Sequence, residues 1–444
     1  MASSSTAGSI SLPVVLTTQT PYPLPSQKFM IPATWRRYQL SQLVNKALSL
    51  PKIVPFDFLV RGEILRSSLG EWCAENGAGE EETLEIEYIE SVMPPEKMSD
   101  FPHEDWVSAV SCKVPGQFFT ASYDGTIRSF DYSKKPTSST PAHAAAITSI
   151  SLVPSTTTSP DTFILASASH DLTAHITEVT LSGTEKSTSK TLATLHLHTA
   201  PLSSIASNAT GTHLLTSSWD TLIGYWDTSI PATDEVPEPA LTDRDRKKRR
   251  RVEENGKAAG KRKAPLQVLK SHTARVSKVV FGSDDTAISC GFDSTVRVWD
   301  VENGLCTHTV TAAEKPFLDL ITIGDDPASA NSVLASSTDR TVTHYDMRVS
   351  SSSALPSAAS ASFLHSATPS CLASGPAGSH QFVSGAYDGV VRVWDVRSTK
   401  GAVASFRAWD GTKKVLSVDW DGGVVGVGGE GGFEVWKVGV EESR

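Results

Sequence analysis

Two stretches of this sequence carry a histidine, a hydroxyl residue, an aspartate and a tryptophan in the same order. In both, the aspartate follows the hydroxyl residue by four positions and the tryptophan follows the aspartate by six. A single set of this kind could activate a nucleophile. Because the set recurs, we interpret it as structural rather than catalytic. The members are His272, Ser289, Asp293 and Trp299 in one stretch, and His198, Thr216, Asp220 and Trp226 in the other.

The repeated unit places an acidic turn between two short strands. Consecutive turns are 42 to 49 residues apart, except for an interval of 73 residues between Asp220 and Asp293. This period is typical of a four-stranded propeller blade, and the pattern resembles the WD40 repeat. The resemblance implies that the histidine, hydroxyl residue, aspartate and tryptophan form a buried hydrogen-bonded network that rigidifies each blade. We therefore predict a mainly β chain with a seven-bladed propeller over residues 105–440. The seven turn acids are Asp124, Asp171, Asp220, Asp293, Asp339, Asp388 and Glu430.

The seventh repeat has too few residues for a complete blade. Only eight residues follow Trp436, which leaves too little sequence for a fourth strand in the last blade. Propellers commonly close by taking a strand from the other end of the chain. We expect residues 93–104, the tether that precedes the first blade, to supply this strand.

Residues 12–92 do not follow the repeat. Two short apolar runs flank a proline-rich turn and predict a hairpin, and residues 36–50 have apolar side chains at helical spacing. Short strands at residues 56–60 and 64–65, a helical turn at residues 67–72 and an alternating strand at residues 83–88 follow. This order predicts an α+β, β-grasp, ubiquitin-like domain. Because no Gly-Gly pair follows its last strand, we expect docking rather than covalent conjugation.

Composition narrows the class of protein. The chain has 444 residues, 39% hydrophobic content and a formal net charge of −9, which are values of a globular protein. Its five cysteines are scattered, so we expect reduced, buried thiols, no zinc site and a cytosolic or nuclear location. We find no secretory signal, no apolar run long enough to span a bilayer and no catalytic motif, and we expect a non-enzyme without a cofactor of its own.

The long interval between the third and fourth blades contains a basic insertion, residues 231–265. Residues 243–263 include eleven basic and four acidic residues, a net charge of +7 that leaves −16 for the rest of the chain. Low hydrophobicity predicts a disordered loop. We interpret the basic residues as a bipartite nuclear import signal, with contact to RNA phosphates as a second use and a merely solvated loop as the alternative. The residues are Arg246, Lys247, Lys248, Arg249, Arg250, Arg251, Lys261, Arg262 and Lys263.

The order of the two domains and the joint between them resemble the WD repeat-containing protein 12 family of ribosome biogenesis factors. The segments that carry the resemblance are Val54-Pro-Phe-Asp-Phe-Leu-Val60, Leu84-Glu-Ile-Glu-Tyr88 and Glu104-Asp-Trp-Val-Ser108. The resemblance implies a nucleolar and nucleoplasmic factor in a trimer with pescadillo and a block-of-proliferation WD40 protein. It implies action on the pre-60S particle, with contact to rRNA as a further expectation, and on maturation of 25S/28S and 5.8S rRNA.

The resemblance also implies that the ubiquitin-like domain docks onto the AAA ATPase midasin for release from the pre-ribosome. In that family a glutamate shortly before the last strand of the domain completes the coordination of a magnesium ion held by the ATPase. Magnesium prefers carboxylate oxygen and is seldom fully enclosed by one protein. The matching residue is Glu81, or Glu80 or Glu82 if the register slips, and the alternative is a solvated acidic loop. A second class of function, a ubiquitin-pathway adaptor or substrate receptor, would use the same domain differently.

Overall fold

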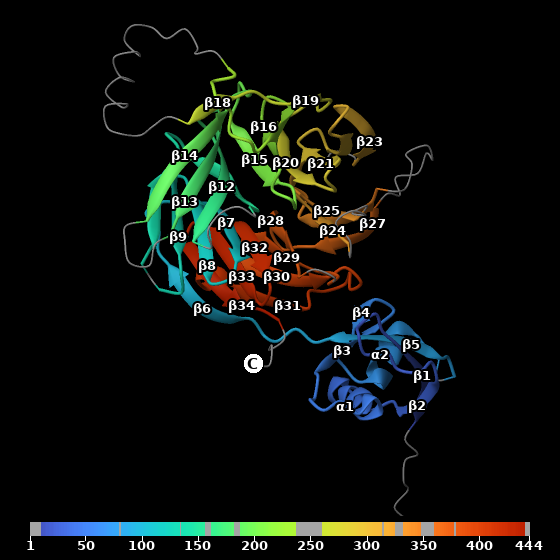
Figure 1. The fold of residues 1–444 in the computed structure, drawn as a ribbon. Helices are drawn as coiled ribbons and strands as arrows, with labels where there is room; N and C mark the ends of the chain where they lie inside the picture. Colours follow the sequence, from blue (N-terminus) through green and yellow to red (C-terminus); the bar gives the residue numbers. More distant parts are fainter. Residues whose placement is uncertain are drawn as a thin grey trace, which may run out of the picture. The chain divides into compact units, whose positions relative to one another are not determined.

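The computed structural model describes residues 10–79, 81–133, 135–155, 161–181, 187–236, 260–312, 315–324, 332–347, 359–376 and 379–439. The chain divides into two compact units, an N-terminal unit that includes residues up to Pro95 and a larger unit that begins at Glu96 (Figure 1). No helix in the described part of the chain is long and apolar enough to cross a membrane.

The N-terminal unit contains one mixed sheet and two helices. Its elements are β1 (Ser11–Thr17), β2 (Lys28–Pro32), α1 (Arg37–Leu48), β3 (Phe56–Val60), β4 (Glu63–Ile64), α2 (Leu69–Asn76) and β5 (Leu84–Glu90). The strand order is β2-β1-β5-β3-β4, with β1 parallel to β5 and the other pairs antiparallel. This is the predicted β-grasp arrangement, with every predicted strand present.

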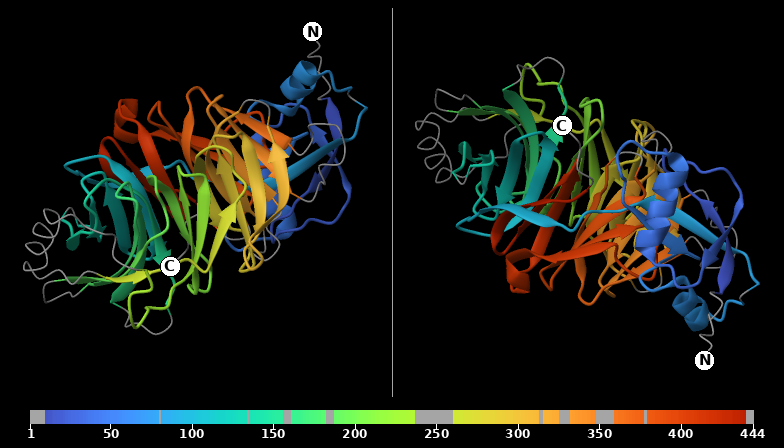
Figure 2. Two further views of the ribbon diagram at one scale, coloured as in Figure 1. Left: turned by 90° about the horizontal axis from the view of Figure 1, so that it is seen from above. Right: turned by 90° about the horizontal axis from the view of Figure 1, so that it is seen from below.

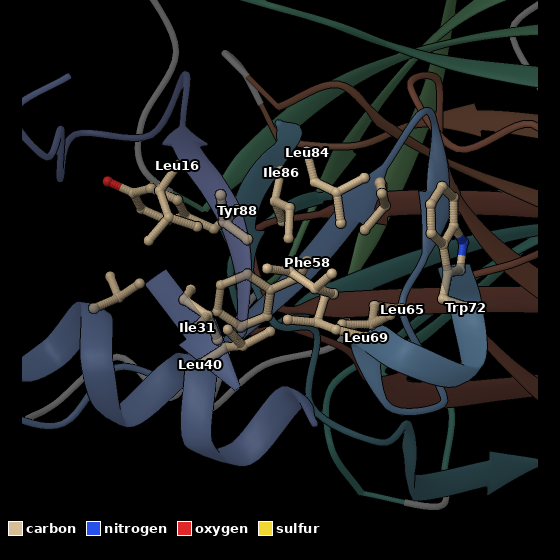
Figure 3. Packing of buried hydrophobic residues seen from close by; sticks show 14 of the residues in the cluster. Leu16, Ile31, Leu40, Phe58, Leu65, Leu69, Trp72, Leu84, Ile86 and Tyr88 are labelled. Atoms are coloured by element: carbon tan, nitrogen blue, oxygen red, sulfur yellow. The ribbon is translucent and has the colours of Figure 1, made fainter. Parts of the chain in front are cut away.

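The core of this unit explains why the local pattern folds as it does. The alternation in β5 turns Leu84, Ile86 and Tyr88 inward and leaves Glu85 exposed. Figure 3 shows how side chains from both helices and from β3 and β5 meet in this core. The second helix is longer than the predicted turn, because Ser68 forms a capping box with Glu71 and the helix continues to Asn76.

The larger unit consists of seven sheets among the described residues. The first three contain β7 (Val107–Val114), β8 (Gln117–Ser122), β9 (Thr126–Phe130) and β10 (Ser138–Pro141); β11 (Ile147–Val153), β12 (Thr162–Ser169), β13 (Ala174–Thr180), β14 (Thr188–Leu195) and β18 (Lys261–Lys263); and β15 (Leu202–Ser207), β16 (His213–Ser218), β17 (Leu222–Asp227) and β19 (Gln267–Lys270).

The next three sheets contain β20 (Val276–Phe281), β21 (Thr286–Gly291), β22 (Thr295–Asp300) and β23 (Leu305–Thr311); β24 (Phe317–Ile323), β25 (Ser332–Ser337), β26 (Thr341–Asp346) and β27 (Ala359–Leu364); and β28 (Pro369–Ser374), β29 (Gln381–Ala386), β30 (Val390–Asp395) and β31 (Ala404–Arg407). The last sheet contains β32 (Val415–Asp421), β33 (Val424–Gly429), β34 (Gly432–Lys437) and β6 (Glu96–Phe101), and a short 3₁₀ helix, Ala408–Gly411, precedes it.

The sheets form a closed ring. The innermost strands β7, β11, β15, β20, β24, β28 and β32 contact one another in that order, and β32 contacts β7 again. Apolar side chains fill the space between neighbouring sheets, for example Leu195, Leu214 and Trp226 between the second and third. The ring is therefore a propeller of seven blades, each meeting the next through an apolar layer.

The last blade contains a strand from the beginning of the larger unit. β6 pairs antiparallel with β34, with Phe101 opposite Phe433 and Lys97 opposite Trp436 (Figure 1, Figure 2). The Phe101 and Phe433 rings stack with their centres 5.3 Å apart. Beside them, the Lys97 ammonium lies 2.7 Å from the carboxylate of Glu434, whose side chain is only 1% exposed. The closing strand is thus held by backbone bonds, an aromatic stack and an ion pair.

Candidate functional site

The acidic loop of the N-terminal unit joins α2 to β5. Its start is fixed by Gly77, which ends α2 in the left-handed conformation at φ 64° and donates its N–H to the Cys73 carbonyl. Its end is fixed by Lys28, whose ammonium donates to the Thr83 hydroxyl at 3.3 Å. Between these points, the Arg61 guanidinium binds the Glu82 carboxylate at 2.5 Å. The loop is short and held at both ends.

The three candidate glutamates of this loop differ in their surroundings. Glu82 is paired with Arg61. Glu81 is exposed, and among the described residues its carboxylate has no hydrogen-bond or ion-pair partner. Glu80 lies outside the described residues. Glu82 is already paired with Arg61. Among the described residues of the loop, Glu81 is therefore the glutamate that can bind a cation without first breaking an ion pair within the domain.

A groove of about 390 Å³ borders this loop on the side of the sheet. It is lined by the β3–β4 turn, by Glu82 and by the first part of β5, including the exposed Glu85. Arg61 stands at its edge in the left-handed conformation, with φ 50°, and its guanidinium lies 5.9 Å from the centre of the Trp72 ring. The groove is therefore acidic apart from Arg61, and suits a partner that presents positive charge.

Both predicted networks are assembled within single blades of the ring. In one, His272 contacts Asp293 through Nδ1 at 2.8 Å and Ser289 through Nε2 at 2.7 Å, and the Trp299 indole N–H donates to the same Ser289 oxygen at 2.8 Å. In the other, the corresponding distances from His198 are 3.1 Å to Asp220 and 2.9 Å to Thr216, and Trp226 donates to Thr216 at 2.9 Å. Each serine or threonine oxygen is held from two sides.

The electrostatics of these networks fit a structural role. Burial alone would raise the pKa of the Asp293 carboxyl, but hydrogen bonds from His272 and Thr295 hold it well below its ordinary value. The aspartate therefore stays ionised. It also accepts backbone N–H groups from Thr273 and Thr295, so that it pins the turn between β21 and β22 to the loop before β20.

Three further blades carry related networks that were not among the predicted site residues. His143 contacts Asp171 at 2.9 Å and Ser167 at 2.8 Å, with a threonine, Thr177, where the tryptophan would stand. In the other two blades the histidine Nδ1 faces a backbone carbonyl instead of the turn aspartate. His103 contacts the Phe101 carbonyl and Thr120, and His365 contacts the Phe363 carbonyl and Ser384. All three have a histidine 17 to 24 residues before a hydroxyl residue that is followed four positions later by an aspartate, and the set of His365, Ser384 and Asp388 also keeps a tryptophan, Trp394, six positions further on.

The structure divides the predicted import signal. Arg246, Lys247, Lys248, Arg249, Arg250 and Arg251 lie outside the described residues. Lys261–Lys263 form β18, which pairs parallel to β14, so the prediction of a disordered segment is wrong for them. Arg262 and Lys263 are 7% and 2% exposed. The Lys263 ammonium binds the Asp227 carboxylate and the Ser229 carbonyl, which replaces the water that would otherwise solvate it.

The segment before the basic block and the segment after it are joined by hydrogen bonds. The Arg262 N–H donates to Asp234 at 2.9 Å, the Glu235 N–H donates to the Arg262 carbonyl at 2.9 Å, and the Ala264 N–H donates to Glu235 at 2.9 Å. Residues 229–235 and 261–264 therefore form a short, ordered stem. The acidic residues that precede the basic block act here as acceptors for the returning chain.

The cysteines and the channel give no further chemistry. Cys73, Cys112, Cys290 and Cys371 are buried, as predicted, whereas Cys306 is only half-buried. Among the described residues, no group of three or more histidine, cysteine, aspartate or glutamate side chains could hold a metal ion. A cavity of about 650 Å³ lies between the inner strands of the ring. Its Lys278 pairs with Asp319 at 3.3 Å, and Asp319 also accepts the Leu372 N–H of the next blade.

The fold and the site define a WD40-repeat protein with an N-terminal ubiquitin-like domain. Residues 12–73 match the NLE (NUC135) domain, and residues 96–131, 189–227, 263–300 and 361–395 match the WD domain, G-beta repeat. The chain is 63% identical to the ribosome biogenesis protein YTM1 of Laccaria bicolor, over 99% of this chain and 97% of that protein. It is 62% identical to the YTM1 protein of Coprinopsis cinerea, over 96% and 95%, and 31% identical to that of Eremothecium gossypii, over 88% of each.

The chain belongs to the YTM1 family of ribosome biogenesis proteins, the WD repeat-containing protein 12 family. The resemblance predicted from the order of the two domains is confirmed. The family is one of WD40 factors that are not known as catalytic, which agrees with the expectation of a non-enzyme.

Proposed function

We propose that this ribosome biogenesis factor is a non-catalytic assembly factor of the large ribosomal subunit, and that its N-terminal domain docks onto the magnesium centre of the AAA ATPase midasin. Family membership supports the general role. The docking step is supported by one observation above the others, the exposed and unpartnered Glu81 carboxylate on a loop fixed by its neighbours.

The geometry suits a ligand supplied to another protein. The Arg61–Glu82 pair and the Lys28–Thr83 hydrogen bond hold the flanks of the loop, so little chain entropy is lost when Glu81 binds. A magnesium ion with an open coordination position accepts carboxylate oxygen readily. The acidic groove next to the loop would extend the contact toward positively charged residues of the ATPase.

The propeller is the part that we assign to the trimer with pescadillo and the block-of-proliferation protein. In this proposal the trimer acts on the pre-60S particle in the nucleolus and nucleoplasm and promotes maturation of 25S/28S and 5.8S rRNA. Closed rings without catalytic groups are suited to such scaffolding, because each blade offers separate loops for contact. Residues 246–251 would supply nuclear import, with rRNA contact as a second use.

The decisive test is affinity purification of the tagged full-length protein carrying Glu81→Gln. We expect midasin recovery to fall at least tenfold, while pescadillo and the block-of-proliferation protein are recovered at wild-type levels. Glu75→Gln, at an exposed glutamate of α2 that does not line the groove, is the matched control and should leave recovery unchanged. Chelation of magnesium should reproduce the Glu81→Gln result with the wild-type protein.

Other outcomes have distinct meanings. Loss with Glu82→Gln but not with Glu81→Gln would move the ligand by one residue, because Glu82 would then have to leave Arg61. Unchanged midasin recovery in both variants would refute the docking proposal. Recovery of ubiquitin-pathway components in place of the ribosomal partners would favour the adaptor function instead.

A further inference from the structure

Each blade has one structurally equivalent residue position at the end of the ring that carries the acidic turns. In six blades the residue before the turn acid donates its backbone N–H to the carbonyl of the residue before the inner strand, and in the last blade the turn acid Glu430 itself makes this bond. These bonds are 2.9 to 3.2 Å long and fix seven residues at the same end of the ring. The seven are Tyr123, His170, Trp219, Phe292, Thr338, Tyr387 and Glu430.

Four of these positions carry large aromatic side chains, and on the third and fourth blades they enclose an arginine. The Arg275 guanidinium lies 3.5 Å from the centre of the Phe292 ring and 5.4 Å from that of Trp219. The His170 ring lies 5.4 Å from Trp219. Trp219 is nevertheless 43% exposed, and Arg275 is exposed too. We call His170, Trp219, Arg275 and Phe292 the aromatic–arginine cluster.

Arg275 has no acidic partner. Among the residues that the structure describes, its guanidinium has no hydrogen bond and no ion pair. The turn acids that flank it are already engaged, Asp220 with His198 and Asp293 with His272. Stacking therefore orients the guanidinium while leaving its N–H donors for another molecule. Stacked, exposed arginine with tryptophan is the composition of a binding hot spot.

A second aromatic group on the ring serves as an internal comparison. There the Lys414 ammonium lies 6.0 Å from the Trp106 ring and 5.9 Å from the Tyr387 ring. Unlike Arg275, Lys414 is paired with a carboxylate, Glu430, at 3.4 Å. Of these two groups in the described part of the ring, the aromatic–arginine cluster is the one that combines a fixed cation with unsatisfied donors.

We propose that the aromatic–arginine cluster binds a protein segment that carries a carboxylate next to an apolar or aromatic side chain. The guanidinium would pair bidentately with the carboxylate, and the exposed face of Trp219 would cover the neighbouring side chain. A protein segment fits better than a nucleic acid, since one cation does not offset a chain of net charge −9 against a run of phosphates. This inference goes beyond the docking of the N-terminal domain and does not depend on Glu81.

The test uses the full-length protein and a fluorescein-labelled peptide pool with a central Glu-Phe pair and randomised flanking positions. Fluorescence anisotropy compares it with the same pool carrying Gln-Phe and with a single-stranded RNA of similar length. We expect the acidic pool to bind at least fivefold more tightly than the amide pool and more tightly than the RNA. Arg275→Gln should weaken binding of the acidic pool about tenfold.

Two further variants separate stacking from charge. Arg275→Lys keeps the charge but loses the planar fork, so we expect an intermediate affinity, and Trp219→Ala should weaken binding although the cation remains. Lys414→Gln is the matched control and should bind as the wild type does. Equal binding of the two pools, unchanged binding by Arg275→Gln, or preference for the RNA would each overturn the proposal. Thermal melting of each variant checks that the ring is intact.

Discussion

We predict that two changes at one ion pair have unequal effects on the closure of the ring. The two changes are Lys97→Met and Glu434→Gln. Glu434 is 1% exposed, whereas the Lys97 side chain is 42% exposed. Removing the lysine leaves a buried carboxylate whose remaining donors are the Trp436 indole at 3.0 Å and the Trp409 N–H at 3.4 Å. Removing the glutamate's charge leaves a lysine that can turn into water.

The magnitudes follow from this asymmetry. Loss of one partner of a fully buried pair costs about 3–5 kcal/mol, and partial access of water to Lys97 reduces this to about 2–3 kcal/mol for Lys97→Met. Glu434→Gln should cost about 1 kcal/mol, the value of one ordinary hydrogen bond. The double variant should cost little more than Glu434→Gln alone, because the unpaired carboxylate is then absent.

Hydrogen exchange measures this locally in the full-length protein. A loss of 2–3 kcal/mol should accelerate exchange of the β6 and β34 amides about 30- to 140-fold, at 1.4 kcal/mol per factor of ten. Lys437→Met, which removes an exposed lysine of β34, is the matched control and should have no measurable effect. Equal acceleration by Lys97→Met and Glu434→Gln, or acceleration spread evenly over all blades, would refute the reasoning.

Two more predictions concern other buried groups. Burial lowers the pKa of His365 to about 4. The unfolded chain therefore takes up this proton first as the pH falls below about 6.5, and the ring should lose stability down to about pH 4. His365→Gln should remove about 2.5 kcal/mol of the difference in unfolding free energy between pH 7 and pH 4.5. Urea unfolding at both pH values measures it, and an unchanged difference would contradict the assignment. Lys263→Met should destabilise β18 and β17 by about 1–3 kcal/mol, because Asp227 loses its cation. Lys261→Met, at an exposed position of the same strand, should change exchange of these strands by less than about 0.5 kcal/mol; equal effects of the two variants would show that the ion pair contributes nothing.

Much of the fold could be predicted because its determinants repeat at short range. Ser289, Asp293 and Trp299 lie within a dozen residues of one another, so their spacing was visible in the sequence, and the resemblance to the WD40 repeat added His272 to the network. The N-terminal strands were predicted for the same reason, since their alternation is local. The structure also places β6, which lies within the predicted tether of residues 93–104, beside β34.

Other features depend on contacts that no local pattern contains. The sequence 261–263 has the composition of a solvated loop, but Asp227 and Ser229 lie beside Lys263 and bury it. The Lys97–Glu434 pair joins residues from opposite ends of the ring. The difference in surroundings between Glu81 and Glu82 could not be predicted from three adjacent glutamates, because it depends on the position of Arg61 in a separate turn.

The closing strand also sets a condition on how the protein is made. β6 leaves the ribosome early, but β34 follows only after roughly 330 further residues, which takes about 15 to 70 s at ordinary elongation rates. During this time β6 is an unpaired strand. Its sequence carries Glu96, Lys97 and Asp100 beside two large apolar residues, Met98 and Phe101, and charged side chains of this kind discourage pairing with other chains. One of these charged residues, Lys97, later forms the ion pair with Glu434. The same residue therefore discourages pairing with other chains before the last blade folds and stabilises the closing strand afterwards.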